Sequence, residues 1–184
     1  MVDYALNETW TFYFHKKQEN VLYVDNIIKL IDVSNIKDFW GTINNMPMPL
    51  LSFSENGNRK KLRIDDNIYI PNAYSFFRKD IFPSWENCRE GSEICLKLNN
   101  LELTNRYFLD LMLLVIGNFD DIAEYINGIR VVDSSYNVRN NYKIEIWFNI
   151  VCDFSDAKKI ISNYLNLTDT SVILYREHSK IEEH

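Results

Sequence analysis

The sequence has few glycines, cysteines and histidines, and each shortage removes a class of function. Its five glycines are scattered and never form the Gly-x-x-x-x-Gly-Lys pattern that cradles nucleotide phosphates. Cys88, Cys95 and Cys152 form no paired motif and have no histidine at metal-ligand spacing, so we expect thiols in a reducing compartment and neither a metal nor another cofactor. The three histidines are expected in loops or near chain ends without a nucleophile motif beside them, which argues against an enzyme.

An excess of positive charge and long hydrophobic runs are also missing. The formal net charge is −6 and the pI is about 5.1, whereas a general nucleic-acid binder needs a basic face. Recognition of a single nucleotide is still compatible with this charge. No apolar run is long enough to span a membrane and the N-terminus has no signal-peptide pattern, so we expect a cytoplasmic protein without a membrane contact. With 184 residues, 46% of them apolar, the chain is expected to form a single domain over residues 1–184.

The first third of the chain predicts a strand, a helix and a long insertion. Apolar aromatic residues alternate with more polar ones over residues 9–15, which is the period of a strand. Residues 21–31 show no clean period and are interpreted as an extended or irregular segment. Ser34 is a good N-cap, and apolar residues at three- and four-residue spacing predict a helix over residues 35–45. Prolines then end this helix, and residues 46–72 are interpreted as a long inserted loop without an assigned role.

The remainder alternates strands with two further helices. Thr104 is a suitable N-cap for a helix that ends at Gly117, where glycine favours the left-handed conformation, and residues 155–165 have the pattern of a third amphipathic helix. Further strands are predicted over residues 74–79, 93–98, 128–132, 142–148 and 172–175. Strand pairs separated by single helices predict an α/β (α+β) fold, a curved and mostly antiparallel sheet with three helices packed on its convex face.

Residues 80–86, Asp-Ile-Phe-Pro-Ser-Trp-Glu, carry the clearest binding chemistry. Pro83 favours a loop, and Trp85 followed by Glu86 offers a flat π-face next to a carboxylate. An indole stacks on a positively charged ring, and a carboxylate accepts two N–H donors from the edge of a guanine. The pair suits a cationic planar base. The competing interpretation is a core tryptophan followed by a solvated glutamate.

Seven short motifs follow one another along the chain. They are Trp-x-Phe-x-Phe at 10–14, Asp-Phe-Trp at 38–40, Tyr-Ser-Phe-Phe at 74–77, Pro-Ser-Trp-Glu at 83–86, Arg-Tyr-Phe-Leu at 106–109, Asn-Gly at 127–128 and Lys-Ile-x-Ile-Trp at 143–147. Each motif is weak alone. In this order, from about residue 6 to residue 178, they resemble the translation initiation factor 4E family, whose members bind the 7-methylguanosine cap of messenger RNA.

The resemblance implies that two aromatic rings clasp the methylated guanine and that a glutamate contacts its edge. Trp85 matches the second ring and Glu86 matches the glutamate. The first ring falls on Tyr23, where the family usually has Trp and its 4E-homologous member has Tyr. The smaller ring still stacks, with a cation interaction weaker by about 1 kcal/mol. The alternative for Tyr23 is an ordinary surface tyrosine.

For the triphosphate, the resemblance implies one lysine and one arginine. Lys143 matches the lysine, because it lies four residues before Trp147. The tryptophan that matches Trp147 touches the methyl group of the guanine in the family, and Trp147 should face the open side of the sheet. This hairpin carries extra residues, so two arginines can match the arginine of the family. Arg139 is favoured and fits if the insertion precedes it, whereas Arg130 would serve if the insertion lies at the hairpin tip. Without the resemblance, each charge is more simply interpreted as solvated surface.

A second site is implied on the helical face. Family members bind scaffold 4G-type or 4E-binding-protein-type partners through a peptide helix with a Tyr-x-x-x-x-Leu-hydrophobic motif. The matching positions are Ile36, Trp40, Leu109, Asp110 and Leu113, with Asp110 in place of the usual Glu. For Trp40 the competing interpretation is a core residue.

These positions together predict a monomer that binds capped messenger RNA without catalysis and recruits a scaffold protein for translation initiation. Three alternatives stay open: a cap-binding repressor of the same family, an adaptor that no longer binds the cap, and a cap-cleaving enzyme. The sequence does not distinguish activation of translation from repression.

Overall fold

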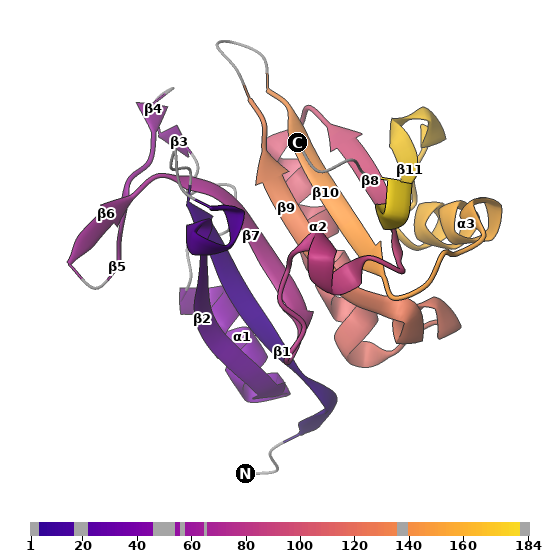
Figure 1. Ribbon diagram of the computed structural model, residues 1–184. Coiled ribbons are helices and arrows are strands. Elements are labelled where there is room, and N and C mark those ends of the chain that lie inside the picture. Colours follow the sequence, from indigo (N-terminus) through magenta and orange to yellow (C-terminus); the bar gives the residue numbers. More distant parts are fainter. Residues whose placement is uncertain are drawn as a thin grey trace.

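One seven-stranded antiparallel sheet organises the computed structural model, which describes residues 4–16, 22–45, 54–55, 58–64, 66–135 and 140–180. The strand order is β11-β8-β10-β9-β7-β1-β2, and Figure 1 shows the twist of the sheet. The strands are β1 (Ala5–Lys16), β2 (Ile27–Asn35), β7 (Pro71–Arg78), β8 (Ser92–Leu98), β9 (Ile126–Asp133), β10 (Tyr142–Phe148) and β11 (Ile173–Glu177).

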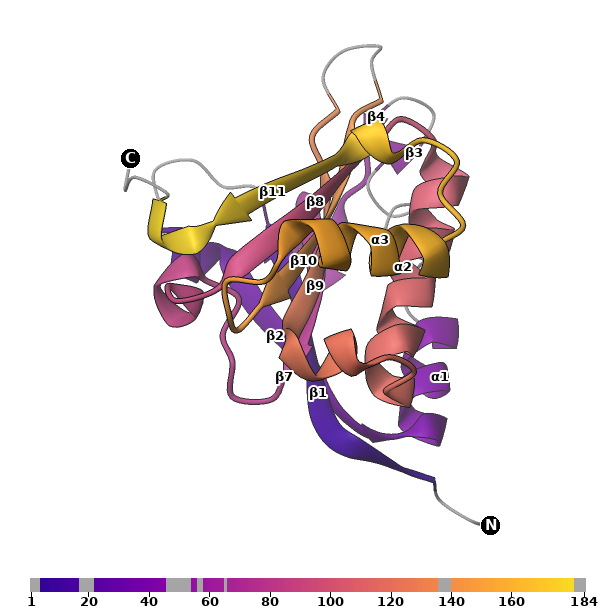
Figure 2. The ribbon, with the colours of Figure 1, turned by 90° about the vertical axis from the view of Figure 1, so that its right-hand side faces the viewer.

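Three α-helices, α1 (Ile36–Asn45), α2 (Leu101–Gly117) and α3 (Phe154–Tyr164), lie on one face of this sheet. Figure 2 shows all three on one side, and the short 3-10 helices η1 (Tyr23–Asn26) and η3 (Trp85–Cys88) on the other. This arrangement confirms the predicted α+β fold with helices on one face of an antiparallel sheet.

Several shorter elements complete the chain. The remaining 3-10 helices are η4 (Asp121–Tyr125), η5 (Thr170–Val172) and η6 (His178–Lys180). The predicted insertion contains two small ladders, β3 (Ser54–Glu55) with β4 (Asn58–Arg59) and β5 (Leu62–Ile64) with β6 (Asn67–Tyr69). Within the described ranges, no helix has the length and apolar character needed to cross a membrane.

Aromatic side chains of the strands fill the space between sheet and helices. Trp10, Phe12 and Phe14 alternate along β1 and are almost completely buried, where Phe39 of α1 and Phe108 of α2 join them. Burial of one large apolar side chain contributes roughly 1.5–3 kcal/mol. The aromatic cluster therefore holds the helices on this face and leaves the other face for a different purpose.

The opposite face carries a smaller apolar cluster. Its members are Tyr13, Ile27, Phe77, Cys88 and Trp147. A Cβ atom at Gly128 would lie 2.2 Å from the Phe77 ring, so only glycine lets this ring pack against β9. Cys88 belongs to η3, which means that this cluster attaches the segment between β7 and β8 to the sheet.

The strand β2 begins at Ile27, within the segment that the sequence predicts as extended or irregular over residues 21–31. This strand lies at the edge of the sheet, and only Ile27 and Val33 of it are buried. An edge strand with so few buried positions has no clear alternation of apolar and polar residues, which is why its sequence shows no period.

The first helix is capped one residue later than predicted. Asn35, not Ser34, accepts a hydrogen bond from the backbone N–H of Asp38, at 2.8 Å. Both residue types are good N-caps, so composition alone could not choose between neighbours.

The second helix begins and ends at asparagines. Asn100 is its N-cap, four residues before Thr104, which lies inside the helix. At the other end Asn118, not Gly117, takes the left-handed conformation, with a φ of 48°. Asparagine tolerates that conformation better than other residues with a side chain. The left-handed residue therefore lies one position after the glycine that the sequence predicts.

Candidate functional site

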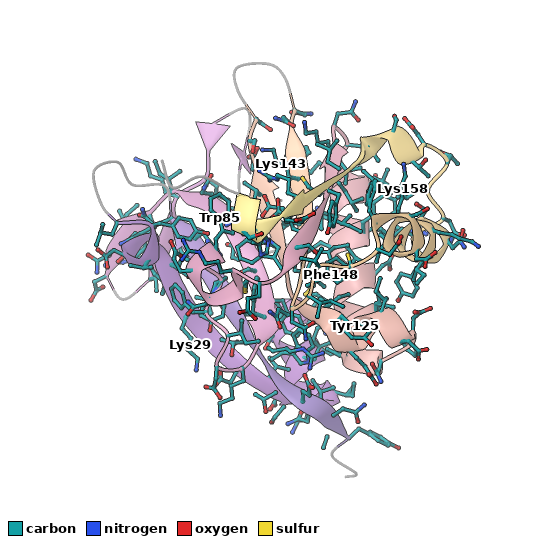
Figure 3. The ribbon with its side chains drawn as sticks, turned by 45° about the vertical axis from the view of Figure 1, so that its right-hand side comes forward. Lys29, Trp85, Tyr125, Lys143, Phe148 and Lys158 are labelled. Atoms are coloured by element: carbon teal, nitrogen blue, oxygen red, sulfur yellow. The ribbon has the colours of Figure 1, made fainter. Side chains whose placement is uncertain are left out.

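Two loops meet on the face of the sheet that the α-helices leave free. The first loop contains η1 with Tyr23, and the second contains η3 with Trp85 and Glu86. Tyr23 is 46% exposed and Trp85 is 38% exposed, so neither ring is a core residue. Figure 3 shows Trp85 in front of the sheet, with Lys143 farther along β10.

A hydrogen bond joins the two loops. The Tyr23 hydroxyl donates to the backbone carbonyl of Pro83 at 3.3 Å, two residues before Trp85. The ring of Tyr23 is exposed while its hydroxyl end is enclosed, and this burial raises the pKa of Tyr23 although the charge of Arg130 acts in the opposite direction. The segments that bear the two predicted rings therefore lie next to each other.

Arg130 of β9 holds the inner end of Tyr23. Its Nη1 donates to the Tyr23 hydroxyl, and its Nε donates to Glu145 Oε2 at 2.7 Å. Arg130 and Glu145 lie directly opposite each other on β9 and β10, and their side chains are only 12% and 5% exposed. Burial disfavours the guanidinium charge, but Glu145, Tyr23 and Glu93 together outweigh burial and raise the pKa of Arg130 above its ordinary value. The guanidinium is therefore fully charged.

Trp147 lies on the predicted face but is not open to solvent. It belongs to the small cluster opposite the helices, and it is completely buried. The Arg130 guanidinium lies 5.3 Å from its ring centre, the His178 ring lies 4.9 Å away, and its Nε1 donates to Glu145 Oε2 at 3.4 Å. The predicted orientation is correct and the predicted exposure is wrong, because charged neighbours and the η3 segment cover the indole.

Glu86 presents an ionised carboxylate beside Trp85. The side chain is exposed, and hydrogen bonds from its own backbone N–H and from Ser84 hold its pKa below the ordinary value. A carboxylate of this kind can accept two N–H donors from one planar group.

Lys143 is half-buried on β10 and has another lysine as a neighbour. Its Cα partners are Val132 on β9 and Lys97 on β8. Like charges directly across strands repel, so an anion placed over Lys97 and Lys143 would be favourable. Arg139 lies outside the described residues. Arg130 lies within them, but Glu145 and Tyr23 already engage two of its donors.

Sequence reasoning missed a second charged group on this face. Glu93 of β8 lies opposite Trp147 of β10 and is completely buried. It is flanked by Arg176 of β11 and by His178. Strand alternation could have placed Glu93 on this face, but only the pairing of three strands that are distant in sequence shows that it is enclosed.

The residues predicted for a peptide site lie on the helical face. Trp40 of α1 is 39% exposed, which excludes the interpretation as a core residue. Ile36, Leu109 and Leu113 are half-buried, and Figure 2 shows α1 and α2 on the same side of the sheet. Asp110 is also half-buried and forms an i,i+4 ion pair with Arg106 at 3.5 Å.

Two cavities differ in their relation to these residues. A cleft of about 200 Å³ borders Tyr23, His15 and Arg130. A wider one, of about 680 Å³, lies between the start of α2 and η5, and none of the predicted site residues lines it. The part of the chain that is described contains no group of three His, Cys, Asp or Glu residues arranged to hold a metal ion.

Comparison with known proteins agrees with this geometry. Residues 5–184 match the family described as "Eukaryotic initiation factor 4E". The eukaryotic translation initiation factor 4E of Candida albicans is 27% identical over 188 residues, which cover 95% of this chain and 79% of that protein. The factor of Dictyostelium discoideum is 25% identical, covering 97% of this chain and 66% of its own length.

Solved structures share the fold. The chain superposes on C. elegans eIF4E-3, solved with the 4E-binding protein Mextli and a cap analog, with a TM-score of 0.73, 20% identity and coverage of 96% and 94% of the two chains. Ascaris suum eIF4E-3, solved with the m7G cap, gives a TM-score of 0.73, 22% identity and coverage of 100% and 96%.

Proposed function

Because the chain belongs to the eukaryotic initiation factor 4E family, we propose that it binds the 7-methylguanosine cap of messenger RNA between Tyr23 and Trp85, without catalysis. One observation carries the proposal: two exposed aromatic rings sit on adjacent loops, and an ionised glutamate follows the second ring. Methylation gives the guanine a positive charge, so the base stacks on electron-rich rings while Glu86 accepts hydrogen bonds from its edge.

The phosphates of the cap extend along β10 in this proposal. Lys143 and its opposite neighbour Lys97 supply positive charge there. Arg139 is our preferred further phosphate contact, because Arg130 donates to Glu145 and Tyr23 instead. Trp147 is completely buried and supports the site from beneath η3. Affinity for the cap should therefore fall as salt rises, whereas stacking makes the preference for the methylated base persist.

We also propose that α1 and α2 bind a peptide helix from a 4G-type scaffold or a 4E-binding protein. Trp40 offers an exposed indole, and Leu109 and Leu113 lie one helical turn apart on α2. Asp110 can accept a hydrogen bond from the peptide once it leaves Arg106. Recruitment of a scaffold would make the protein an initiation factor, and recruitment of a repressor would make it an inhibitor of translation.

Calorimetric titration with 7-methyl-GTP and with GTP tests the cap site. We expect tighter binding of the methylated nucleotide, and a loss of about 1.5–3 kcal/mol, roughly 10- to 150-fold in affinity, for Trp85→Ala and for Glu86→Gln. Trp40→Ala is the matched control, because Trp40 and Trp85 are almost equally exposed but belong to α1 and η3, which lie on opposite faces of the sheet. Equal binding of both nucleotides, or unchanged binding by Trp85→Ala, would contradict the proposal.

The same samples separate the alternative functions. Chromatography of the nucleotide after the titration should recover it unchanged, and release of a methylated mononucleotide from a dinucleotide cap would indicate a cap-cleaving enzyme. A protein that captures a scaffold peptide but binds neither nucleotide would be an adaptor.

A further inference from the structure

His178 connects the C-terminal end of the sheet to the loop that carries Trp85 and Glu86. It follows β11 directly, and its ring is completely buried. The Nδ1 atom lies 2.8 Å from the backbone carbonyl oxygen of Cys88, the last residue of η3. A carbonyl oxygen only accepts hydrogen bonds, so Nδ1 carries the hydrogen of this contact.

Two backbone hydrogen bonds reinforce the same connection. The N–H of His178 donates to the Gly91 carbonyl at 3.0 Å, and the N–H of Gly91 donates to the Cys88 carbonyl at 2.9 Å. The end of η3 is thus attached to His178 at two points, and Glu86 lies only two residues before Cys88.

The other nitrogen of His178 faces a carboxylate. Nε2 lies 3.7 Å from Glu93 Oε2, with both side chains completely buried. Arg176 Nη2 approaches Glu93 Oε1 to 2.5 Å. Within the described residues, however, neither Nε2 nor either carboxylate oxygen has a partner in good hydrogen-bond geometry. A nitrogen lone pair facing a buried carboxylate would be strongly unfavourable, so a proton must lie between the two groups.

That proton belongs to His178. Burial alone would raise the pKa of Glu93, but its contact with His178 and the charges of Arg176 and Arg130 outweigh burial and hold the pKa below its ordinary value. Glu93, in contact with the Arg176 guanidinium, is therefore a carboxylate, and the acceptors that face both ring nitrogens of His178 are satisfied only when each nitrogen carries a hydrogen.

Other ionisable groups also surround the His178–Glu93 pair. They are Cys88 on η3, Cys95 on β8, Arg130 on β9, Glu145 on β10 and Arg176 on β11. Burial raises the pKa of Cys88, and it raises the pKa of Cys95 to about 11, so both thiols stay neutral. Arg130 is paired with Glu145.

Loss of the proton leaves no satisfactory neutral form. With the hydrogen on Nδ1, the contact with Cys88 survives, but the Nε2 lone pair faces Glu93. With the hydrogen on Nε2, the contact with Glu93 is satisfied, but the Nδ1 lone pair faces the Cys88 carbonyl. Either tautomer places two acceptors against each other in a buried space.

We propose that the His178–Glu93 pair is a positioning device for the cap-binding loop, in which the doubly protonated imidazole holds η3, and with it Trp85 and Glu86, against the sheet. This inference rests on the proposed cap site. Since loss of a ring hydrogen weakens the attachment to Cys88 or to Glu93, cap affinity decreases as the pH rises.

Two conservative variants replace the proton with a permanent donor. In Glu93→Gln the amide donates to Nε2 of a neutral imidazole, so both contacts persist at high pH. In His178→Asn the amide nitrogen occupies the position of Nδ1 and donates to Cys88 without titrating. His178→Ala, the third variant, removes the donor and should bind the cap weakly at every pH.

The experiment is a titration with 7-methyl-GTP between pH 6 and pH 9 for the native protein and the three variants. Because each protein meets the same nucleotide, ionisation of the ligand cancels when affinities are compared at one pH. We expect the ratio of Glu93→Gln affinity to native affinity to rise about tenfold over this range, the effect of losing one charge-assisted hydrogen bond. A constant ratio would overturn the inference and leave the cap site intact.

Amide hydrogen exchange of the ligand-free protein provides the second measurement. After correction for the intrinsic effect of pH, the Gly91 and His178 amides of the native protein should lose protection above neutral pH, and those of Glu93→Gln should not. If no protein binds the nucleotide, the proposed function fails, and this measurement still decides whether the pair holds η3. Equal protection in the two proteins at every pH would reject the device.

Discussion

At the scale of single residues, the buried Arg130–Glu145 pair is the most consequential feature of the face that carries the candidate site. The two side chains are charged, enclosed and in direct contact. Removing one partner of such a pair leaves the other as an uncompensated buried charge, which typically costs about 3–5 kcal/mol. We predict this loss of unfolding free energy for Arg130→Met, measured by urea denaturation. Arg130→Met combined with Glu145→Met should recover most of it, and failure to recover would mean that the pair does not act as a unit.

Tyr23 depends on the same pair through its hydroxyl. Tyr23→Phe keeps the stacking ring but removes the acceptor for Arg130 and the donor to Pro83. We predict a decrease of about tenfold in cap affinity, because the ring is no longer fixed in orientation. In an Arg130→Met background the same substitution should have a smaller effect, as expected for coupled residues. Additive losses would show that Arg130 does not position Tyr23.

At the scale of secondary-structure elements, patterned segments were predictable and the edges were not. The alternation of Ile144, Ile146 and Phe148 against Trp147 predicts β10 over residues 142–148, the range that it occupies. The edge strand β2 could be predicted only as extended or irregular, because it buries too few residues to show a period. Helix ends were misplaced by one to four residues where asparagine took the capping position.

The residues of the candidate site also differ in how far the sequence could predict them. Trp85 and Glu86 are adjacent in sequence, so a short motif is sufficient to find them. Glu93 and His178 lie 85 residues apart by their numbers, and only the pairing of β8 with β11 brings them together. No local pattern contains that information, since a single Glu in a strand is usually interpreted as solvent-facing.

The helical face provides a prediction about α1 and α2. Trp40→Ala should abolish capture of a Tyr-x-x-x-x-Leu-hydrophobic peptide, because the largest exposed apolar surface of α1 is then missing. Unfolding free energy should change by less than about 1 kcal/mol, since Trp40 is 39% exposed. Peptide pull-down and urea denaturation measure the two effects. A large loss of stability together with peptide binding would mean that Trp40 supports the core through its contact with Phe39.

At the scale of the whole molecule, buried ionisable groups set how stability depends on pH. His15 is buried, and Nε2 lies 2.8 Å from Ser75 Oγ. Burial, and then the charge of Arg130, hold the pKa of His15 well below its ordinary value of 6.5. The folded protein keeps His15 neutral while the unfolded chain takes up a proton below pH 6.5. The contribution of His15 is therefore complete above pH 6.5 and is lost as the pH falls toward the lower folded pKa.

We predict a loss of at most about 2 kcal/mol of unfolding free energy between pH 6.5 and pH 5 from this residue, because each pH unit contributes no more than 1.36 kcal/mol. His15→Gln places an amide nitrogen near the position of Nε2 and does not titrate, so its stability should be nearly constant over this range. Urea denaturation at the two pH values measures the difference. Parallel losses in both proteins would assign the effect to groups other than His15, and Glu93 is not one of them, because its lowered pKa acts only below about pH 4.5.

The two pH effects have opposite signs and separate the fold from the site. Neutral His15 favours the folded state above pH 6.5, whereas protonated His178 attaches η3 most firmly at lower pH. At pH 8.5 the contribution of His15 to the unfolding free energy should be complete, while cap binding relative to Glu93→Gln is at its weakest. A parallel decrease of stability and affinity at that pH would mean that the whole sheet, and not η3 alone, responds to the loss of the His178 proton.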